Sequence, residues 1–155
     1  MQDNQIKYSL NKATAAEIET HLMQCSSRFI PPLHETVDIP EYSQKIFQNS
    51  VTFENWNSSI LTGLVAIYLN DPNGNTGFIT NVSALREVSG KGIALELMQR
   101  CIRHTRNLNF REIVLEVSRE NTRVIRFYEF FKFTITGEKP GLFTMRLALR
   151  TEGKC

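Results

Sequence analysis

Several features of common protein classes are missing from the sequence. Its three cysteines, Cys25, Cys101 and Cys155, are too far apart for a disulfide framework, and no run approaches the roughly 20 apolar residues that cross a bilayer. Its three histidines form no short-spaced set with each other or with a cysteine, so we expect no metal ion. Because the first residues also lack a basic region followed by an apolar stretch, we expect a cytoplasmic protein that makes no membrane contact.

Charge of one sign is not concentrated anywhere. The 155 residues include 18 basic and 16 acidic side chains, which give a formal net charge of +2. They are spread along the chain, whereas a protein that binds a phosphate backbone needs a basic stripe, so we expect no nucleic-acid partner. With 41% hydrophobic residues and no repeat or linker, the sequence predicts a single domain over residues 1–155.

The sequence does contain hydrophobic periodicity of two kinds. Strand-like runs occupy about 6–11, 51–56, 60–69, 77–85, 111–118, 133–137 and 142–149. Helical spacing follows the caps Thr14 and Asp38 and recurs over about 92–107 and 121–131. The strand-helix-strand order around 92–107 requires a crossover, so the strands on either side of that helix should pair in parallel. The predicted fold class is α/β (α+β), with a mixed central sheet of about six or seven strands and about four helices.

A glycine-containing turn leads from the strand near residue 80 into the helix near residue 100. Its sequence is Ser89-Gly90-Lys91-Gly92-Ile93-Ala94. Such a turn presents unpaired backbone N–H groups at the positive end of the helix dipole, which suits a diphosphate. Leu95 stands where the dinucleotide-binding motif needs a third glycine, and the Gly-Lys-Ser/Thr of a nucleoside-triphosphate loop is absent. The turn therefore indicates either another kind of diphosphate site or an ordinary helix start.

The same turn resembles the acetyl-CoA loop of the GNAT N-acetyltransferase superfamily, Gln/Arg-x-x-Gly-x-Gly/Ala. Gly92-Ile93-Ala94 matches the second half of this motif, and Ser89 replaces the Gln or Arg. The resemblance covers about residues 77 to 137 in the family's element order. It includes Asn81-Val82-Ser83-Ala84-Leu85 upstream and Leu115-Glu116-Val117, Asn121, Phe127-Tyr128-Glu129 and Phe133 downstream. Lys132 replaces the customary glycine before Phe133.

The resemblance implies a set of contacts to acetyl-CoA, the acyl donor. The backbone of Val82, Ser83 and Ala84 is expected to pair with the pantetheine arm, and Asn121 to bond it. The pyrophosphate is expected to lie against the turn residues Gly90, Lys91, Gly92, Ile93, Ala94 and Leu95. Tyr128 is expected near the sulfur. A phenol, whose ordinary pKa of about 10 lies above the roughly 8.5 of a thiol, stays protonated there and can donate a hydrogen bond or a proton to the thiolate.

Both catalytic assignments leave alternatives open. Tyr128 also falls on an apolar helix face, where a packed tyrosine with a satisfied hydroxyl is the other interpretation, and we interpret its neighbours Phe127, Phe130, Phe131 and Phe133 as core. Glu116 is the first choice for the general base. It precedes Tyr128 by the same interval as the paired base and acid of the N-terminal acetyltransferases of ribosomal proteins, which this stretch resembles. A structural glutamate paired with an arginine is the alternative, and Glu54 and a water relay are the other candidate bases.

These residues predict an acyltransferase that moves acetyl from acetyl-CoA to a primary amine of a small molecule or a peptide N-terminus. We expect direct transfer in a ternary complex, without an acyl-enzyme and without a metal. The departures at Ser89 and Lys132 support a second hypothesis, a non-catalytic module that binds an acyl-CoA as a sensor or docking signal. The sequence does not name the acceptor, and it leaves a homodimer open.

Overall fold

The computed structural model describes residues 6–149. Residues 1–5 and 150–155, including Cys155, belong to the predicted domain but lie outside the described part. The helices are α1 (Ala15–Cys25), α2 (Ile39–Asn49), α3 (Ile93–Asn107) and α4 (Thr122–Phe130), with short 3-10 helices η1 (Ser26–Arg28), η2 (Leu33–Glu35) and η3 (Arg86–Val88). The strands are β1 (Ile6–Leu10), β2 (Val51–Asn57), β3 (Ile60–Tyr68), β4 (Thr76–Ala84), β5 (Glu112–Ser118), β6 (Thr134–Lys139) and β7 (Leu142–Ala148).

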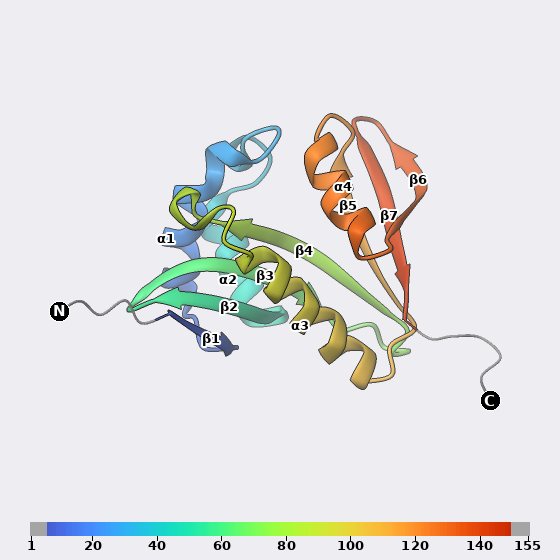
Figure 1. Ribbon diagram of the computed structural model, residues 1–155, viewed down its shortest axis with the longest axis horizontal. Helices are drawn as coiled ribbons and strands as arrows, with labels where there is room; N and C mark the ends of the chain where they lie inside the picture. The colour runs from blue at the N-terminus through green and yellow to red at the C-terminus, as the bar shows by residue number, and fades with distance from the viewer. Residues whose placement is uncertain (1–5, 150–155) are drawn as a thin grey trace.

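The strands of the described residues form one sheet in the order β1-β2-β3-β4-β5-β7-β6 (Figure 1). All neighbours pair antiparallel except β4 and β5, which run parallel. Helix α3 lies between these two strands in the chain, because a tight turn cannot join parallel strands. The predicted mixed sheet, its seven strands and four α-helices and the parallel crossover are therefore confirmed.

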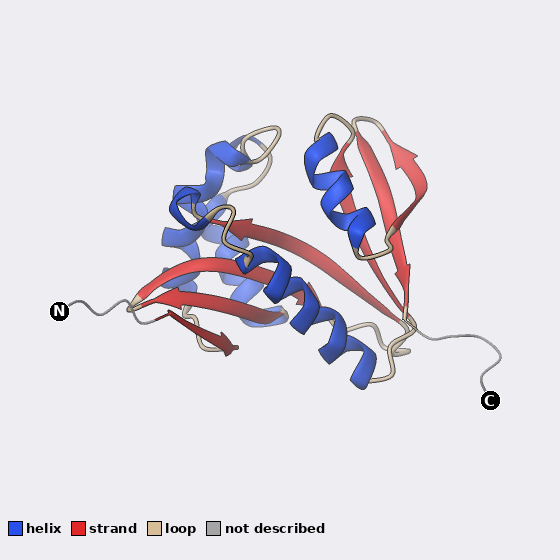
Figure 2. Cartoon of the chain, viewed as in Figure 1, coloured by secondary structure: helices blue, strands red, loops and turns tan. Residues whose placement is uncertain are grey.

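Helices cover both faces of the sheet, α3 and α4 on one and α1 and α2 on the other (Figure 2). Successive residues of β3 point alternately to the two faces, as strand geometry requires. Leu64 and Ala66 join the core under α1 and α2, while Val65 and Ile67 join the core under α3. Burial on both faces explains why β3 is a continuous apolar run in the sequence.

The aromatic segment around α4 divides between core and surface. Tyr128 and Phe133 are buried, and Phe127 and Phe131 pack against the same core. Phe130, however, is 65% exposed, so its interpretation as core is wrong. The buried face of this short helix carries Ile125 and Tyr128, and a residue two positions after Tyr128 points away from that face.

Glu54 on β2 forms hydrogen bonds with β1 and with the segment between β1 and α1. Its side chain is completely buried. Its carboxylate accepts hydrogen bonds from the hydroxyls of Ser9 and Thr52, both at 2.6 Å, and from the backbone N–H groups of Lys12 and Ala13 at 3.0 and 2.9 Å. A buried carboxylate is stable only when such donors compensate its lost hydration. Glu54 therefore fixes the chain between β1 and α1, and its oxygens are occupied.

We expect Glu54→Ala to lower the free energy of unfolding by about 3 kcal/mol, because it leaves several buried donors without an acceptor. Urea denaturation measures this change. The matched control is Glu138→Ala, which removes an exposed carboxylate paired with Arg119 and should cost less than about 0.5 kcal/mol. Equal losses in the two variants would show that the Glu54 hydrogen bonds contribute no more than a surface ion pair.

Candidate functional site

The open edge of β4 is the first element of the candidate site. Strands β4 and β5 pair only from Thr76 to Phe78 and from Glu112 to Val114. Beyond these residues β4 pairs only with β3, and β5 only with β7, so the two strands diverge (Figure 1). The predicted pantetheine contacts, Val82, Ser83 and Ala84, lie on the diverging part of β4. Their strand therefore has one edge that no described strand covers, where an extended ligand can pair with the backbone.

A β-bulge at Thr80 begins this diverging part. The register passes from Ile67 opposite Ile79 to Ala66 opposite Asn81, which leaves Thr80 without a partner on β3. Tyr42 of α2 provides a hydrogen bond to this unpaired residue. Its hydroxyl donates to the Thr80 carbonyl at 2.6 Å and lies 2.8 Å from the Thr80 Oγ1. Burial raises the pKa of the Tyr42 hydroxyl, so the donor stays protonated. Sequence patterns gave no signal for this contact, because the two residues are 38 positions apart.

The predicted diphosphate turn enters α3 without a side-chain cap. Gly90 and Gly92 have φ values of +83° and +78°, a backbone conformation that glycine adopts without strain. The side chains of Thr14, Asp38 and Asn121 cap α1, α2 and α4, but no side chain caps α3. The first helical bond there runs from the Glu96 N–H to the Gly92 carbonyl. The N–H groups of residues 92–95 consequently have no helical partner, which fits the binding of a diphosphate.

Tyr128 of α4 is buried, and its ring lies among other aromatic side chains. Its ring packs against Phe127 and Phe133, with ring centroids 5.6 and 5.8 Å away. No residue in the described part of the chain forms a hydrogen bond with its hydroxyl. Burial, with a smaller contribution from the nearby Tyr42, raises the pKa of Tyr128 far above its ordinary value. The side chain thus presents a protonated phenol. The alternative interpretation requires a hydrogen-bond partner for the hydroxyl within the core, and residues 6–149 provide none.

Glu116 lies on the other face of β5 from Tyr128. Leu115 and Val117 point into the core that contains Tyr128, so alternation along the strand directs Glu116 away from it. The Glu116 side chain is 30% exposed and forms an ion pair with Lys139 of β6. The partner is therefore a lysine rather than the arginine of our alternative. Because Glu116 follows the last residue that pairs with β4, it lies where the two strands have separated.

The two ends of α4 keep the expected geometry. Asn121 caps its start through Oδ1, which accepts from the Val124 N–H at 3.4 Å. At its other end the N–H groups of Lys132 and Phe133 donate to the carbonyls of Glu129 and Tyr128. This pattern requires a left-handed residue, and Lys132 adopts φ +81° although it is not glycine. The replacement at Lys132 therefore leaves the helix exit intact, at the expense of some backbone strain.

Comparison with known proteins assigns the family. A model of the acetyltransferase (GNAT) family matches residues 17–133 of the sequence. The chain belongs to the GNAT acetyltransferase family. No curated protein sequence matches the chain. Membership in the GNAT family supports acetyl transfer to an amine as the chemistry of the site.

Solved structures share the fold of this GNAT protein. The ribosomal-protein-S18-alanine N-acetyltransferase from Escherichia coli has a TM-score of 0.75 and 12% identity, over 96% of this chain and 97% of that chain. PaiA N-acetyltransferase from Thermoplasma acidophilum, solved in complex with coenzyme A, has a TM-score of 0.70 and 14% identity, over 92% and 99%. An N-acetyltransferase from Staphylococcus aureus Mu50 has a TM-score of 0.69 and 18% identity, over 93% and 99%. No helix of residues 6–149 is long and apolar enough to cross a membrane.

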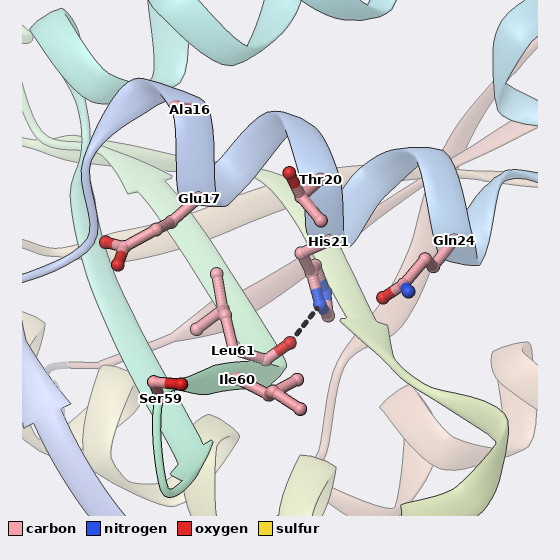
Figure 3. A pocket seen from close by; sticks show the side chains of 8 residues that line it. All are labelled: Ala16, Glu17, Thr20, His21, Gln24, Ser59, Ile60 and Leu61. Carbon is pink, nitrogen blue, oxygen red and sulfur yellow. Dashed lines mark hydrogen bonds between the residues drawn. The ribbon is translucent and has the colours of Figure 1, made fainter.

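A buried histidine of this GNAT protein connects α1 to the open strand. His21 Nδ1 donates to the Leu61 carbonyl at 2.9 Å (Figure 3), and its Nε2 lies 2.9 Å from the Ser83 hydroxyl. Burial lowers the pKa of His21 from 6.5 to about 4, so the ring is neutral at pH 7. The link was not predicted, because Ser83 lies 62 residues away. His21 therefore holds the end of β4 that carries the predicted pantetheine contacts.

His21 also forms the floor of a surface hollow of about 280 Å³ (Figure 3). The hollow lies between α1 and the start of β3 and is lined by Ala16, Glu17, Thr20, His21, Gln24, Ser59, Ile60 and Leu61. None of these is a predicted site residue. None of the lining residues belongs to β4, so the hollow is not formed by the open edge of that strand.

We expect His21 to make the protein less stable as the pH falls. Above pH 6.5 the ring is neutral in both the folded and the unfolded chain; between 6.5 and about 4 only the unfolded chain binds the proton. The free energy of unfolding should therefore fall by about 3 kcal/mol across this range through His21. Urea denaturation at several pH values measures it.

His21→Gln should remove this part of the pH dependence. The exposed His34→Gln serves as the control for the same chemical change at the surface. If His21→Gln has the same slope as the wild type, another group causes the acid destabilisation.

Proposed function

We propose that the chain is an acetyl-CoA-dependent N-acetyltransferase that transfers acetyl directly to a primary amine of a small molecule or a peptide N-terminus. One observation carries the proposal: the open edge of β4 continues through η3 into the uncapped turn at Gly92. An extended ligand with a diphosphate therefore meets free backbone groups along its length. The GNAT family match supports acetyl-CoA as that ligand, and the PaiA enzyme of similar fold was solved with coenzyme A.

The residues proposed to hold the donor are those that the family resemblance implies, and they lie along this path. The backbone of Val82, Ser83 and Ala84 pairs with the pantetheine arm. The N–H groups at Gly92, Ile93, Ala94 and Leu95 bind the pyrophosphate, with Gly90 and Lys91 leading into the turn. Asn121 uses its Oδ1 to cap α4, which leaves its Nδ2 to bond the pantetheine.

Acetyl-CoA supplies an acetyl group activated as a thioester. Transfer forms a bond from the amine nitrogen to the carbonyl carbon and breaks the carbon–sulfur bond; one proton leaves the nitrogen and one reaches the sulfur. The cysteines in the described residues do not suit an acyl-enzyme. Cys25 and Cys101 are buried, and burial raises their pKa values to about 11 and about 12, so neither is an effective thiolate at pH 7. Direct transfer agrees with these properties.

Tyr128 assists the departing thiolate. Its hydroxyl is protonated, has no partner among the described residues and is held by the packing of a buried ring. Because its pKa is raised well above that of a thiol, a strong hydrogen bond to the sulfur is favoured over complete proton transfer. Solvent then completes the protonation of the thiolate.

Glu116 accepts the proton of the amine, directly or through one water. It lies beyond the point where β4 and β5 separate and on the opposite face of β5 from Tyr128. In this arrangement the acceptor approaches from the face of Glu116, while the thiolate leaves toward Tyr128. Glu54, the reserve candidate, has both carboxylate oxygens occupied by hydrogen bonds and takes no part in the proposed reaction.

Thiol release from acetyl-CoA over a panel of amines tests the proposal. Amino acids, polyamines, aminosugars and peptides serve as acceptors, and we expect turnover with at least one class. Gly92→Asp should weaken acetyl-CoA binding by more than 10-fold in calorimetric titration, because its carboxylate faces the diphosphate. Gly141→Asp is the matched control, since Gly141 has the same φ of +78° in a distant turn. Tight binding without turnover on any acceptor would instead support the acyl-CoA-binding module.

We expect Tyr128→Phe to lower kcat by roughly 100-fold and to leave acetyl-CoA affinity nearly unchanged. The ring packing is kept, and the lost hydroxyl has no partner in the described part, so thermal melts should shift little. Steady-state rates beside a melt separate the two interpretations. A variant that melts early but acetylates at the parental rate would contradict the role in the reaction and indicate a packed tyrosine.

A further inference from the structure

We propose that Arg28 supplies the diphosphate turn with a positive side chain, which Ser89 is not, and that its guanidinium contacts the pyrophosphate of acetyl-CoA. The inference rests on the proposed function of the turn. It concerns a residue of η1, far from the matched turn in the sequence, to which the resemblance assigns no role.

The position of Arg28 carries the inference. Its Nη2 lies 3.3 Å from the Oγ of Ser89, although the two residues are 61 positions apart. Ser89 is the residue at which the acetyl-CoA loop of the family has Gln or Arg. The guanidinium of Arg28 therefore reaches the place in space where that side chain would begin.

Arg28 forms no ion pair within residues 6–149. The ion pairs of this part of the chain involve other cations, namely Arg100, Arg119, Lys139 and Arg146. The Arg28 residue is half-buried, so its guanidinium is only partly hydrated. A guanidinium suits a diphosphate because its planar fork donates two parallel hydrogen bonds to phosphate oxygens. Next to the free N–H groups at the start of α3, it adds a full charge to a site otherwise made of backbone dipoles.

The segment that carries Arg28 is fixed from both sides. Before it, α1 is anchored by the buried Cys25. Within it, the Ser26 hydroxyl lies 3.0 Å from Nδ1 of His34 and accepts the backbone N–H of the same residue at 3.0 Å, which closes the loop after α1. This closure restricts the backbone that presents Arg28 to the turn.

Calorimetric titration of acetyl-CoA tests the role. Arg28→Gln keeps a donor for Ser89 but removes the charge, and we expect the Kd to rise roughly 10-fold. The matched control is Arg146→Gln on β7, where the arginine pairs with Glu112; it should stay within about 2-fold of the wild type. Ser89→Arg introduced into Arg28→Gln should restore most of the lost affinity, because it returns the charge to the loop itself. A Kd of Arg28→Gln equal to that of Arg146→Gln overturns the inference.

The phosphate that Arg28 contacts is identified with a second ligand, coenzyme A without its 3′-phosphate. The same roughly 10-fold loss for this ligand supports a contact with the pyrophosphate. If Arg28→Gln shows no loss of affinity for coenzyme A without its 3′-phosphate, Arg28 contacts the 3′-phosphate, and the inference as stated is overturned.

The inference and the proposed function fail in different ways. If Gly92→Asp abolishes binding while Arg28→Gln binds normally, the turn holds the diphosphate without Arg28. If the wild-type chain binds no acetyl-CoA, the proposed function itself is contradicted. Thermal melts of each variant confirm that the fold is retained.

Discussion

The parallel pairing of β4 and β5 ends after Phe78 and Val114, and the candidate site depends on this separation. It leaves backbone groups of β4 uncovered within an otherwise continuous sheet. Helix α3 packs against β2, β3 and β4 on one side of it, and α4 lies beside β5, β7 and β6 on the other (Figure 1). After the open strand the chain passes through η3 to the start of α3, so the strand edge and the helix dipole are the two features on which the proposed donor site depends.

The open part of β4 has no neighbouring strand on one edge, and buried polar contacts hold it instead. The Tyr42 hydroxyl donates a hydrogen bond to the Thr80 carbonyl at the bulge, and His21 contacts Ser83 near the end of the strand. Both side chains come from helices on the face opposite α3, and burial keeps both in their neutral forms. The open part of β4 is thus held by side chains from α1 and α2.

The proposed chemistry depends on the position of Tyr128 and Glu116 on opposite faces of β5. Tyr128 lies with the core, where burial keeps its hydroxyl protonated, whereas Glu116 lies on the partly exposed face. A thiolate gains a proton and an amine loses one, so the proposed reaction needs a donor and an acceptor of protons at different positions. In our proposals the positive charge for the diphosphate is likewise divided, between the backbone of the turn and Arg28, which reaches Ser89 from a distant segment.

The sequence by itself determined the elements, the parallel crossover and the glycine turn, because each depends on residues close together in the chain. Periodicity is a local property, and a cap, a crossover length and a left-handed glycine are local too. Tertiary structure alone decided the exposure of Phe130, the hydrogen bonds that occupy Glu54, the partner of Glu116 and the links from His21, Tyr42 and Arg28. These last three contacts join residues 38 to 62 positions apart, and only the packing of helices on the sheet brings them together.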